Sequence, residues 1–242
     1  MTAFNENQYD DVYPPGIENH FWVRARNAII FDLVRSAGVA GGKLMEIGCG
    51  PGLVVNYLRE RGIDCFGCEL AKAPIPQGLA PYVTVGIDAT HLPEEARHSI
   101  DCLLMLDVIE HIEDASGFVR HMAEAFPKAR CLLITVPAHS ELWSNWDEHY
   151  GHFRRYTPVG LGRDLEAAGF KPARICQFFH SLYVPMRLMA LAGHRRSKQH
   201  ATPKWPALHA TIAWLFYQEY KLLPAGLVGT SVAALAFRDS VT

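Results

Sequence analysis

The chain has 242 residues, of which 49% are hydrophobic and 20% charged, and its formal net charge is -2. This composition excludes a disordered chain, and the length supports one domain with a substantial hydrophobic core. The near-neutral charge argues against a general nucleic-acid binder. No uninterrupted apolar run reaches the roughly 18 residues of a membrane span, and the polar N-terminus is not typical of a signal peptide, so we expect a cytoplasmic protein.

Strand and helix patterns alternate along the first 170 residues. Short apolar runs predict buried strands at residues 43–47, 64–69, 82–86, 100–106 and 130–136. Helical patterns fall at residues 53–61, 116–126 and 159–168, and a glycine follows the first and the last of them. The alternation predicts an α/β, doubly wound and mostly parallel sheet, in which ligands bind at the carboxyl ends of the strands.

Six cysteines lie mostly in apolar, strand-like runs, which favours reduced and buried thiols. They are Cys49, Cys65, Cys68, Cys102, Cys131 and Cys176. Cys65 and Cys68 form a lone C-x-x-C without a second pair at zinc-finger spacing, so the pattern gives little support for a metal there.

A segment rich in aromatic residues and leucine separates a strand near Ile175 from a last strand at residues 232–237. It predicts an inserted helical cap at residues 179–228. Between residues 167 and 218 there is no acidic residue but seven basic ones, Lys171, Arg174, Arg187, Arg195, Arg196, Lys198 and Lys204. Two interpretations stay open: a helical lid with a solvated basic rim, or a peripheral surface for an anionic lipid or an anionic substrate.

The most informative motif is Glu46-Ile47-Gly48-Cys49-Gly50-Pro51-Gly52, which follows the first strand and opens a helix. Its glycines permit a tight turn and close approach of a ligand, and the helix N-terminus offers free N–H groups. A dinucleotide fingerprint needs a third glycine where Leu53 stands. The pattern E/D-x-G-x-G-x-G instead resembles motif I of class I S-adenosylmethionine (SAM) methyltransferases.

The segment from residue 43 to 136 resembles this family in the order and spacing of its motifs. Glu69 ends the second strand, Asp88 follows the third, and the run 106–111 (LDVIEH) resembles the D-V-I/L-E-H signature of small-molecule methyltransferases. The resemblance implies a Rossmann-like sheet of seven strands with an antiparallel last strand, and SAM as cofactor with S-adenosylhomocysteine as product.

The same resemblance implies roles for individual residues. Glu69 would accept hydrogen bonds from the ribose hydroxyls, Asp88 would meet the adenine amino group, and Glu46 would contact the methionine end. The cofactor contacts that it implies in this part of the chain are Glu46, Gly48, Cys49, Gly50, Gly52, Glu69, Leu70, Asp88, Ala89, Leu106 and Asp107. Local alternatives stay open: Asp88 as a turn residue, and Asp107 as a helix N-cap.

The N-terminal run 13–26 (YPPGIENHFWVRAR) resembles the lid helix of the same subgroup, so we assign residues 1–40 to an N-terminal lid. His20, Trp22 and Arg26 would then lie over the cofactor, and Arg26 would pair with its carboxylate. Phe21 and Trp22 are equally consistent with core anchors.

Residues 136–158 (VPAHSELWSNWDEHYGHFRRYTP) resemble a segment of a bacterial methyltransferase subgroup and follow the fifth strand, where a substrate should lie. Trp and Tyr can form the wall of an apolar pocket, and Arg can hold an anion. We therefore predict substrate contacts from Tyr13, Trp143, Trp146, Arg154 and Tyr156. The alternative is a loop folded on itself, with Asp147 paired to Arg154 or Arg155, and with Arg155 and Tyr156 anchoring the helix start at Thr157-Pro158.

Methyl transfer from a sulfonium requires alignment, exclusion of water and, for a weak nucleophile, removal of a proton. The candidate bases are His111, His149 and His152, with His111 first because it follows the fourth strand. A divalent metal at Asp107, Glu110 and His111, with His139 or His152 as a further ligand, is a less favoured alternative, so no metal is predicted.

These features predict a SAM-dependent methyltransferase that moves a methyl group to an O or N atom of a small apolar, aromatic or anionic acceptor by in-line SN2 displacement. Nucleic acid is not expected as a partner, and peripheral membrane contact through the basic cap stays open. The alternatives are a nicotinamide-dependent oxidoreductase, disfavoured by Leu53, and a non-catalytic SAM-binding or membrane-docking protein. Motif resemblance specifies the cofactor but leaves the acceptor and the oligomeric state open.

Overall fold

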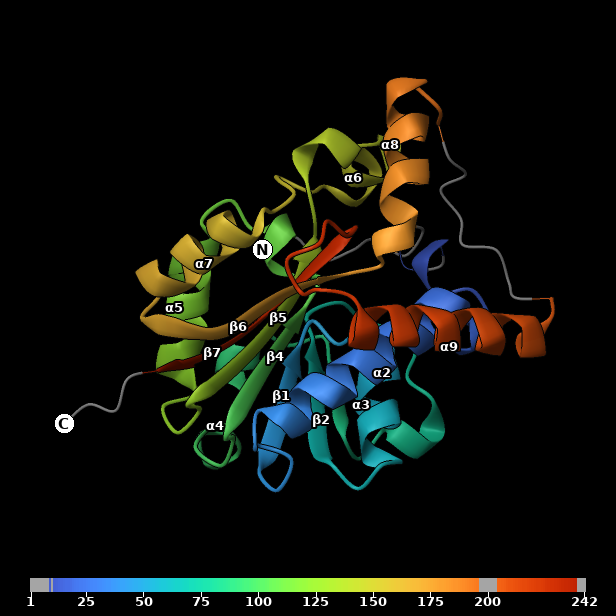
Figure 1. Cartoon of the computed structure of the whole chain (residues 1–242). Helices are drawn as coiled ribbons and strands as arrows, with labels where there is room; N and C mark the ends of the chain where they lie inside the picture. Colours follow the sequence, from blue (N-terminus) through green and yellow to red (C-terminus); the bar gives the residue numbers. More distant parts are fainter. Residues whose placement is uncertain (1–8, 10, 196–203, 239–242) are drawn as a thin grey trace.

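The computed structural model describes residues 9, 11–195 and 204–238. Two basic residues of the predicted cap, Arg196 and Lys198, and the first eight residues of the predicted lid lie outside the described residues. The centre of the molecule is a twisted sheet with helices on both faces (Figure 1).

Within the described residues the sheet has seven strands in the order β3-β2-β1-β4-β5-β7-β6. Strands β1 to β5 pair in parallel, and β7 lies antiparallel between β5 and β6. The predicted doubly wound sheet with an antiparallel last strand is therefore confirmed. The strands are β1 Lys43–Ile47, β2 Asp64–Glu69, β3 Val83–Val85, β4 Cys102–Leu106, β5 Cys131–Pro137, β6 Phe170–Phe178 and β7 Ser231–Arg238.

The helices of the described residues alternate with these strands or extend beyond the sheet. They are α2 Phe21–Ser36, α3 Leu53–Arg59, α4 Glu94–Arg97, α5 Ala115–Ala125, α6 Asn145–Tyr150, α7 Pro158–Ala167, α8 Tyr183–Leu191 and α9 Pro206–Leu222. Short 3-10 turns join them: η1 Ile17–Asn19, η2 Gln77–Leu79, η3 Ala89–His91, η4 Ile109–His111, η5 Ser140–Leu142 and η6 His180–Leu182.

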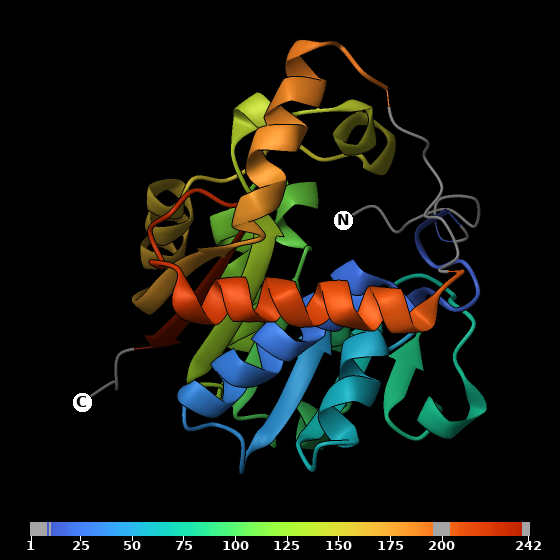
Figure 2. The same ribbon diagram turned by 45° about the vertical axis from the view of Figure 1, so that its right-hand side comes forward.

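The sheet separates two hydrophobic cores. Every residue of β4 is buried, and its side chains alternate between the faces: Leu103 and Met105 pack with α5 and α7, whereas Leu104 packs with α2, α3 and α9. Figures 1 and 2 show these two layers of helices. Burial on both faces explains the continuous apolar runs, because a central parallel strand has no solvent side.

The glycine motif ends where α3 begins. Gly52 is the N-cap residue of α3 at φ +82°, and an added Cβ would lie 3.0 Å from a Val83 methyl and 3.2 Å from Leu79. Glycine is therefore required both by the backbone conformation and by packing. The start of α7 follows the predicted pattern, with the Thr157 side chain accepting the Gly160 N–H at 3.0 Å and Pro158 opening the helix.

Helices α8 and α9 lie between β6 and β7 in the chain, in the segment expected to be a cap. Figure 2 shows α9 running along α2 and α8 projecting away from the sheet. Asp32 of α2 accepts hydrogen bonds from Tyr217, Tyr220 and Lys221 of α9, so α9 is attached to the N-terminal helix. None of the residues of α8 is buried.

The six cysteines are free and buried, as their sequence context predicted. In the part of the chain that the structure describes, none of the helices combines the length and the apolar composition that a membrane span requires.

Candidate active site

A cavity of about 690 Å³ opens at the carboxyl ends of β1, β2 and β4, beneath α2 and α6. It brings together residues from motifs far apart in the sequence. The predicted site residues that line it are Tyr13, Trp22, Arg26, Glu46, Gly48, Cys49, Gly50, Glu69, Leu70, Asp88, Ala89, Leu106, Asp107, His111, Trp146 and His152. The cavity therefore contacts both the motifs expected for a cofactor and two of the three candidate bases.

The other predicted site residues lie elsewhere. Gly52 caps α3, the Nε2 atom of His149 lies 3.2 Å from Asp11 Oδ2, and Tyr156 is in the core. Arg154 donates hydrogen bonds to the carbonyl oxygens of two residues after η4. Trp143 lines a second, smaller pocket.

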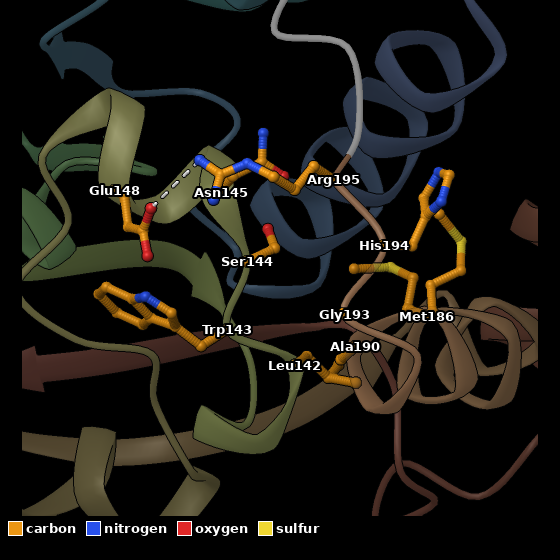
Figure 3. Close-up of a pocket in the computed structure, with 11 residues that line it drawn as sticks. Leu142, Trp143, Ser144, Asn145, Glu148, Met186, Ala190, Gly193, His194 and Arg195 are labelled. Atoms are coloured by element: carbon orange, nitrogen blue, oxygen red, sulfur yellow. Dashed lines mark ion pairs between the residues drawn. The ribbon is translucent and has the colours of Figure 1, made fainter.

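This second pocket, of about 160 Å³, lies between η5–α6 and α8 (Figure 3). Trp143 and Met186 contribute its apolar surface, and Arg195 faces Glu148 with 3.9 Å between Nη2 and Oε2. Met186 also lines the large cavity, so the two spaces meet at this side chain.

Glu46 is the most deeply buried acid at the glycine motif. One of its oxygens, Oε2, is buried and has no hydrogen-bond partner among the described residues, while the Val55 backbone in the first turn of α3 bonds to the carboxyl group. Burial raises the pKa of Glu46 to about 8 although Arg26 acts in the opposite direction. An unsatisfied buried carboxyl in a cavity points to a polar or cationic ligand group.

Glu69 and Asp88 are positioned by backbone N–H groups. Glu69 accepts from Gly50 N and Ala71 N, both at 2.9 Å. Asp88 accepts from the Thr90 N–H at 2.9 Å and its hydroxyl at 2.8 Å. Burial alone would raise the pKa of Asp88, but the bonds from Thr90 outweigh it, and the net shift is downward. Both carboxylates keep further lone pairs for hydroxyl or amino groups of a ligand.

Gly48 and Gly50 have φ angles of +73° and +55°. A Cβ at Gly48 would lie 2.9 Å from Val108, and a Cβ at Gly50 would lie 2.5 Å from the Tyr13 hydroxyl oxygen. A side chain at either position would displace Val108 or Tyr13 and would strain a backbone conformation that glycine adopts freely. The loop therefore presents bare backbone beneath Tyr13.

Arg26 connects α2 to the end of β4. Its Nη2 atom lies 2.7 Å from Asp107 Oδ2, and the Thr135 hydroxyl donates to Asp107 Oδ1 at 3.2 Å. Asp107 adopts φ +59°, an uncommon conformation for a residue with a side chain. The side chain of Asp107 pairs with Arg26, and η4 is capped by Val108 without a side-chain hydrogen bond, so the N-cap alternative for Asp107 is wrong.

Asp147 organises the opposite end of the cavity. It is fully buried and accepts hydrogen bonds from Arg155 at 2.8 and 3.0 Å and from His152 Nδ1 at 2.8 Å. The Arg155 pairing that the sequence left open is thus present. Burial alone would raise the pKa of Asp147, but the hydrogen bonds and charges of these two partners lower it well below its usual range.

Beside this pair lie His111 and Glu110. The imidazole centroids of His111 and His152 are 4.6 Å apart, and Glu110 is 1% exposed with Oε2 unpartnered among the described residues. Burial and, after it, the neighbouring His152 lower the pKa of His111 to about 4. Burial first and then Asp107 raise the pKa of Glu110. Burial therefore disfavours the charged form of both side chains in the ligand-free protein.

Sequence reasoning did not select several residues of the cavity wall. Tyr9, Asn27, Arg155, Thr230 and Ser231 all line it. Thr230 and Ser231 reach it only because β7 inserts between β5 and β6. No local motif signals this placement.

A family model described as a methyltransferase domain matches residues 22–174. That is more than half of the chain, so the chain belongs to this family. The match bears out the predicted class, a SAM-dependent methyltransferase.

Curated relatives agree with this class over part of their length. The ubiquinone biosynthesis O-methyltransferase of Pseudomonas aeruginosa (strain UCBPP-PA14) is 29% identical over 91 residues, which is 35% of this chain and 39% of the relative. The chain therefore aligns with well under two thirds of that protein.

Solved structures support the fold. Magnesium protoporphyrin IX methyltransferase from Synechocystis PCC 6803, solved with bound S-adenosylhomocysteine, has a TM-score of 0.50 at 16% identity, over 99% of this chain and 90% of that one. A cyclopropane-fatty-acyl-phospholipid synthase-like protein from Lactobacillus casei ATCC 334 has a TM-score of 0.50 at 14% identity, over 90% and 92%. At such identities the likeness shows the fold alone.

Proposed function

We propose that the protein transfers a methyl group from SAM to an oxygen atom of a small apolar or aromatic acceptor. The observation that carries this proposal is that one continuous cavity joins the glycine motif to the cluster of Glu110, His111 and His152. The relative named as an O-methyltransferase supports oxygen as the accepting atom. A nitrogen acceptor is the alternative.

The residues at the glycine motif fit the cofactor. Glu46 Oε2 and the buried Arg26 Nε, neither of which has a hydrogen-bond partner in the part of the chain that the structure describes, offer an acceptor and a donor of the kind that an amino acid end group needs. Bare backbone at Gly48 and Gly50 allows close approach, and the oxygens of Glu69 and Asp88 suit the ribose and the adenine amino group. When bound, SAM supplies a methyl group on a positively charged sulfur.

The acceptor would occupy the other end of the cavity, between Trp146, Met186 and the two histidines. In the neutral tautomer that donates Nδ1–H to Asp147, the Nε2 atom of His152 carries the lone pair. The cluster therefore marks the place where an acceptor hydroxyl loses its proton.

Two measurements test this function. Calorimetric titration should show saturable binding of S-adenosylhomocysteine and none of NADH. Mass spectrometry after incubation with SAM and a panel of phenols and aromatic acids should show acceptors heavier by one methylene unit. Binding of NADH alone would favour the oxidoreductase, and cofactor binding without turnover on any acceptor would favour a non-catalytic SAM-binding protein.

We also propose that residues 1–40 act as a lid and residues 179–228 as a cap that contacts an anionic lipid surface. Large apolar side chains of this cap are exposed to solvent, among them Val184, Leu188, Leu191, Trp205, Trp214 and Leu215. The excess of basic residues there would favour anionic lipid. The protein should co-sediment with phosphatidylglycerol vesicles more than with phosphatidylcholine vesicles, and Leu188→Glu should reduce this binding. Equal or absent binding to both would contradict the lipid contact.

A further inference from the structure

Three side chains at the acceptor end of the cavity form a group that could share one metal ion. One ligand atom each from Glu110, His111 and His152 lie within 4.8 Å of one another. They come together because the backbone N–H of Phe153 donates to the carbonyl oxygen of Glu110 at 2.7 Å. This bond fixes the loop after α6 against η4, so the position of His152 relative to His111 is set by the fold.

Each histidine of the group is held from behind. His152 Nδ1 lies 2.8 Å from Asp147 Oδ1, and His111 is hydrogen-bonded to the backbone of Tyr150. A carboxylate or carbonyl on one ring nitrogen orients the other nitrogen, and this is the usual arrangement around metal-binding histidines. Arg155 in turn fixes Asp147 with two hydrogen bonds.

Glu110 provides an independent observation that points to a ligand at this place. Its side chain is almost completely buried, it lines the cavity, and Oε2 has no partner among the described residues. A buried carboxyl without a hydrogen bond is costly unless a cation or donor satisfies it.

The structural group differs from the set that the sequence suggested. Asp107 faces Arg26 and Thr135 and is not part of the group, and His139 Nε2 lies 2.6 Å from Gln177 Oε1. The ligand set is therefore one carboxylate and two imidazoles. Imidazole favours Zn²⁺ and its transition-metal neighbours, whereas Mg²⁺ and Ca²⁺ prefer oxygen ligands.

We propose that Glu110, His111 and His152 bind one divalent transition-metal ion, of the Zn²⁺ or Co²⁺ kind, with an open coordination position toward the cavity. The inference rests on the proposed function, because the open position would take the acceptor oxygen. When bound, the metal would lower the pKa of the acceptor hydroxyl, and its proton would leave to solvent through the open side of the cavity. The oxygen electron pair then forms the O–C bond as the C–S bond breaks and its electrons stay on sulfur.

The test is metal binding by the whole chain, separate from activity. Protein treated with a chelator and then titrated with Co²⁺ should show visible d–d absorption that saturates at one ion per chain. Zn²⁺ should abolish this absorption, and Mg²⁺ in large excess should not. Absence of the absorption in the unaltered chain, or equal displacement by Mg²⁺, would overturn the proposal.

Variants assign the site. Glu110→Gln and His152→Ala should weaken Co²⁺ binding at least tenfold, and Asp147→Asn should weaken it by about 10- to 100-fold through loss of orientation. His98→Ala, an exposed histidine outside the cavity, is the matched control and should bind normally. Unchanged affinity for S-adenosylhomocysteine shows that each variant is folded. Unaltered Co²⁺ binding in His152→Ala would contradict the assignment.

The metal and the proposed function can fail separately. If chelator-treated protein transfers methyl groups at full rate, and if its titration with Co²⁺ gives no absorption, the metal site is refuted and the methyltransferase function stands. One bound Co²⁺ with no methyl transfer to any acceptor would leave the metal site and refute the proposed function.

Discussion

Cofactor binding should release a proton from Glu46. Burial gives this carboxyl a pKa of about 8, against the opposing charge of Arg26 and with smaller raising contributions from Glu69 and Asp107. Roughly 90% of the carboxyls are then protonated at pH 7. A cationic amino group placed against Oε2 favours the ionised form, so binding should release about 0.9 proton at pH 7, about half at pH 8 and about 0.1 at pH 9.

Calorimetry measures this release directly. Titration with S-adenosylhomocysteine at pH 7 in buffers of different ionisation enthalpy should give observed enthalpies that change linearly, with a slope near 0.9 proton. Because the complex favours ionised Glu46, affinity should rise with pH, by nearly tenfold from pH 6 to 7, and level off above pH 8.

The variant Glu46→Gln is the matched control, since it has nearly the same shape and does not titrate. It should bind more weakly and lose the buffer dependence. A slope of zero in the unaltered protein at pH 7, or the same slope in the variant, would refute the placement of Glu46 at the amino group.

Three further changes test other parts of the structure. Gly50→Val should abolish S-adenosylhomocysteine binding, because Gly50 has a φ angle of +55° and an added Cβ would lie 2.5 Å from the Tyr13 hydroxyl oxygen in the cavity. Gly41→Val is the control and should bind normally, because a Cβ at Gly41 meets nothing within 4 Å. Equal affinities of the two variants would contradict the assignment of the glycine motif to the cofactor. Asp147→Ala should lower the free energy of unfolding by about 3–5 kcal/mol in urea titrations, because Arg155 stays buried without its partner, and a loss below about 1 kcal/mol would contradict this. Asp32→Ala removes the hydrogen bonds that α9 donates to α2 and should cost about 1–3 kcal/mol, measured by thermal unfolding; an unchanged melting temperature would show that apolar packing alone holds α9.

The strands were predictable because burial on both faces leaves a strong local signal. The runs 43–47 and 64–69 coincide with β1 and β2 to the residue. Helix α3 ends at Arg59, two residues before the predicted end, because helix ends depend on local turns that periodicity does not encode. The antiparallel β7 came from the family resemblance.

The residues of the candidate site also divide into those with a local sequence signal and those without one. Motifs that sit at strand ends, such as Glu46, Glu69 and Asp88, reach the cavity because the sheet places all these ends together. His149 and His152 show the limit of this reasoning. They are three residues apart, but Gly151 adopts φ +71° between them, so His149 faces Asp11 while His152 faces Asp147 and the cavity.

Contacts between distant segments were beyond reach. The pairing of His111 with His152 spans 41 positions and depends on a backbone hydrogen bond from a loop without regular structure. Asn27 reaches the cavity only through the packing of α2. Such placements follow from tertiary packing, which no periodic pattern records.

We propose that the cluster of Glu110, His111 and His152 at the end of β4 activates the acceptor while the glycine motif holds the cofactor. Turnover with labelled SAM and affinity for S-adenosylhomocysteine should be measured on the same samples of the unaltered chain and of His152→Ala. In His152→Ala, turnover should fall by about 100-fold or more while cofactor affinity stays within about twofold. Full turnover in the variant, or a loss of cofactor affinity in step with turnover, would contradict it.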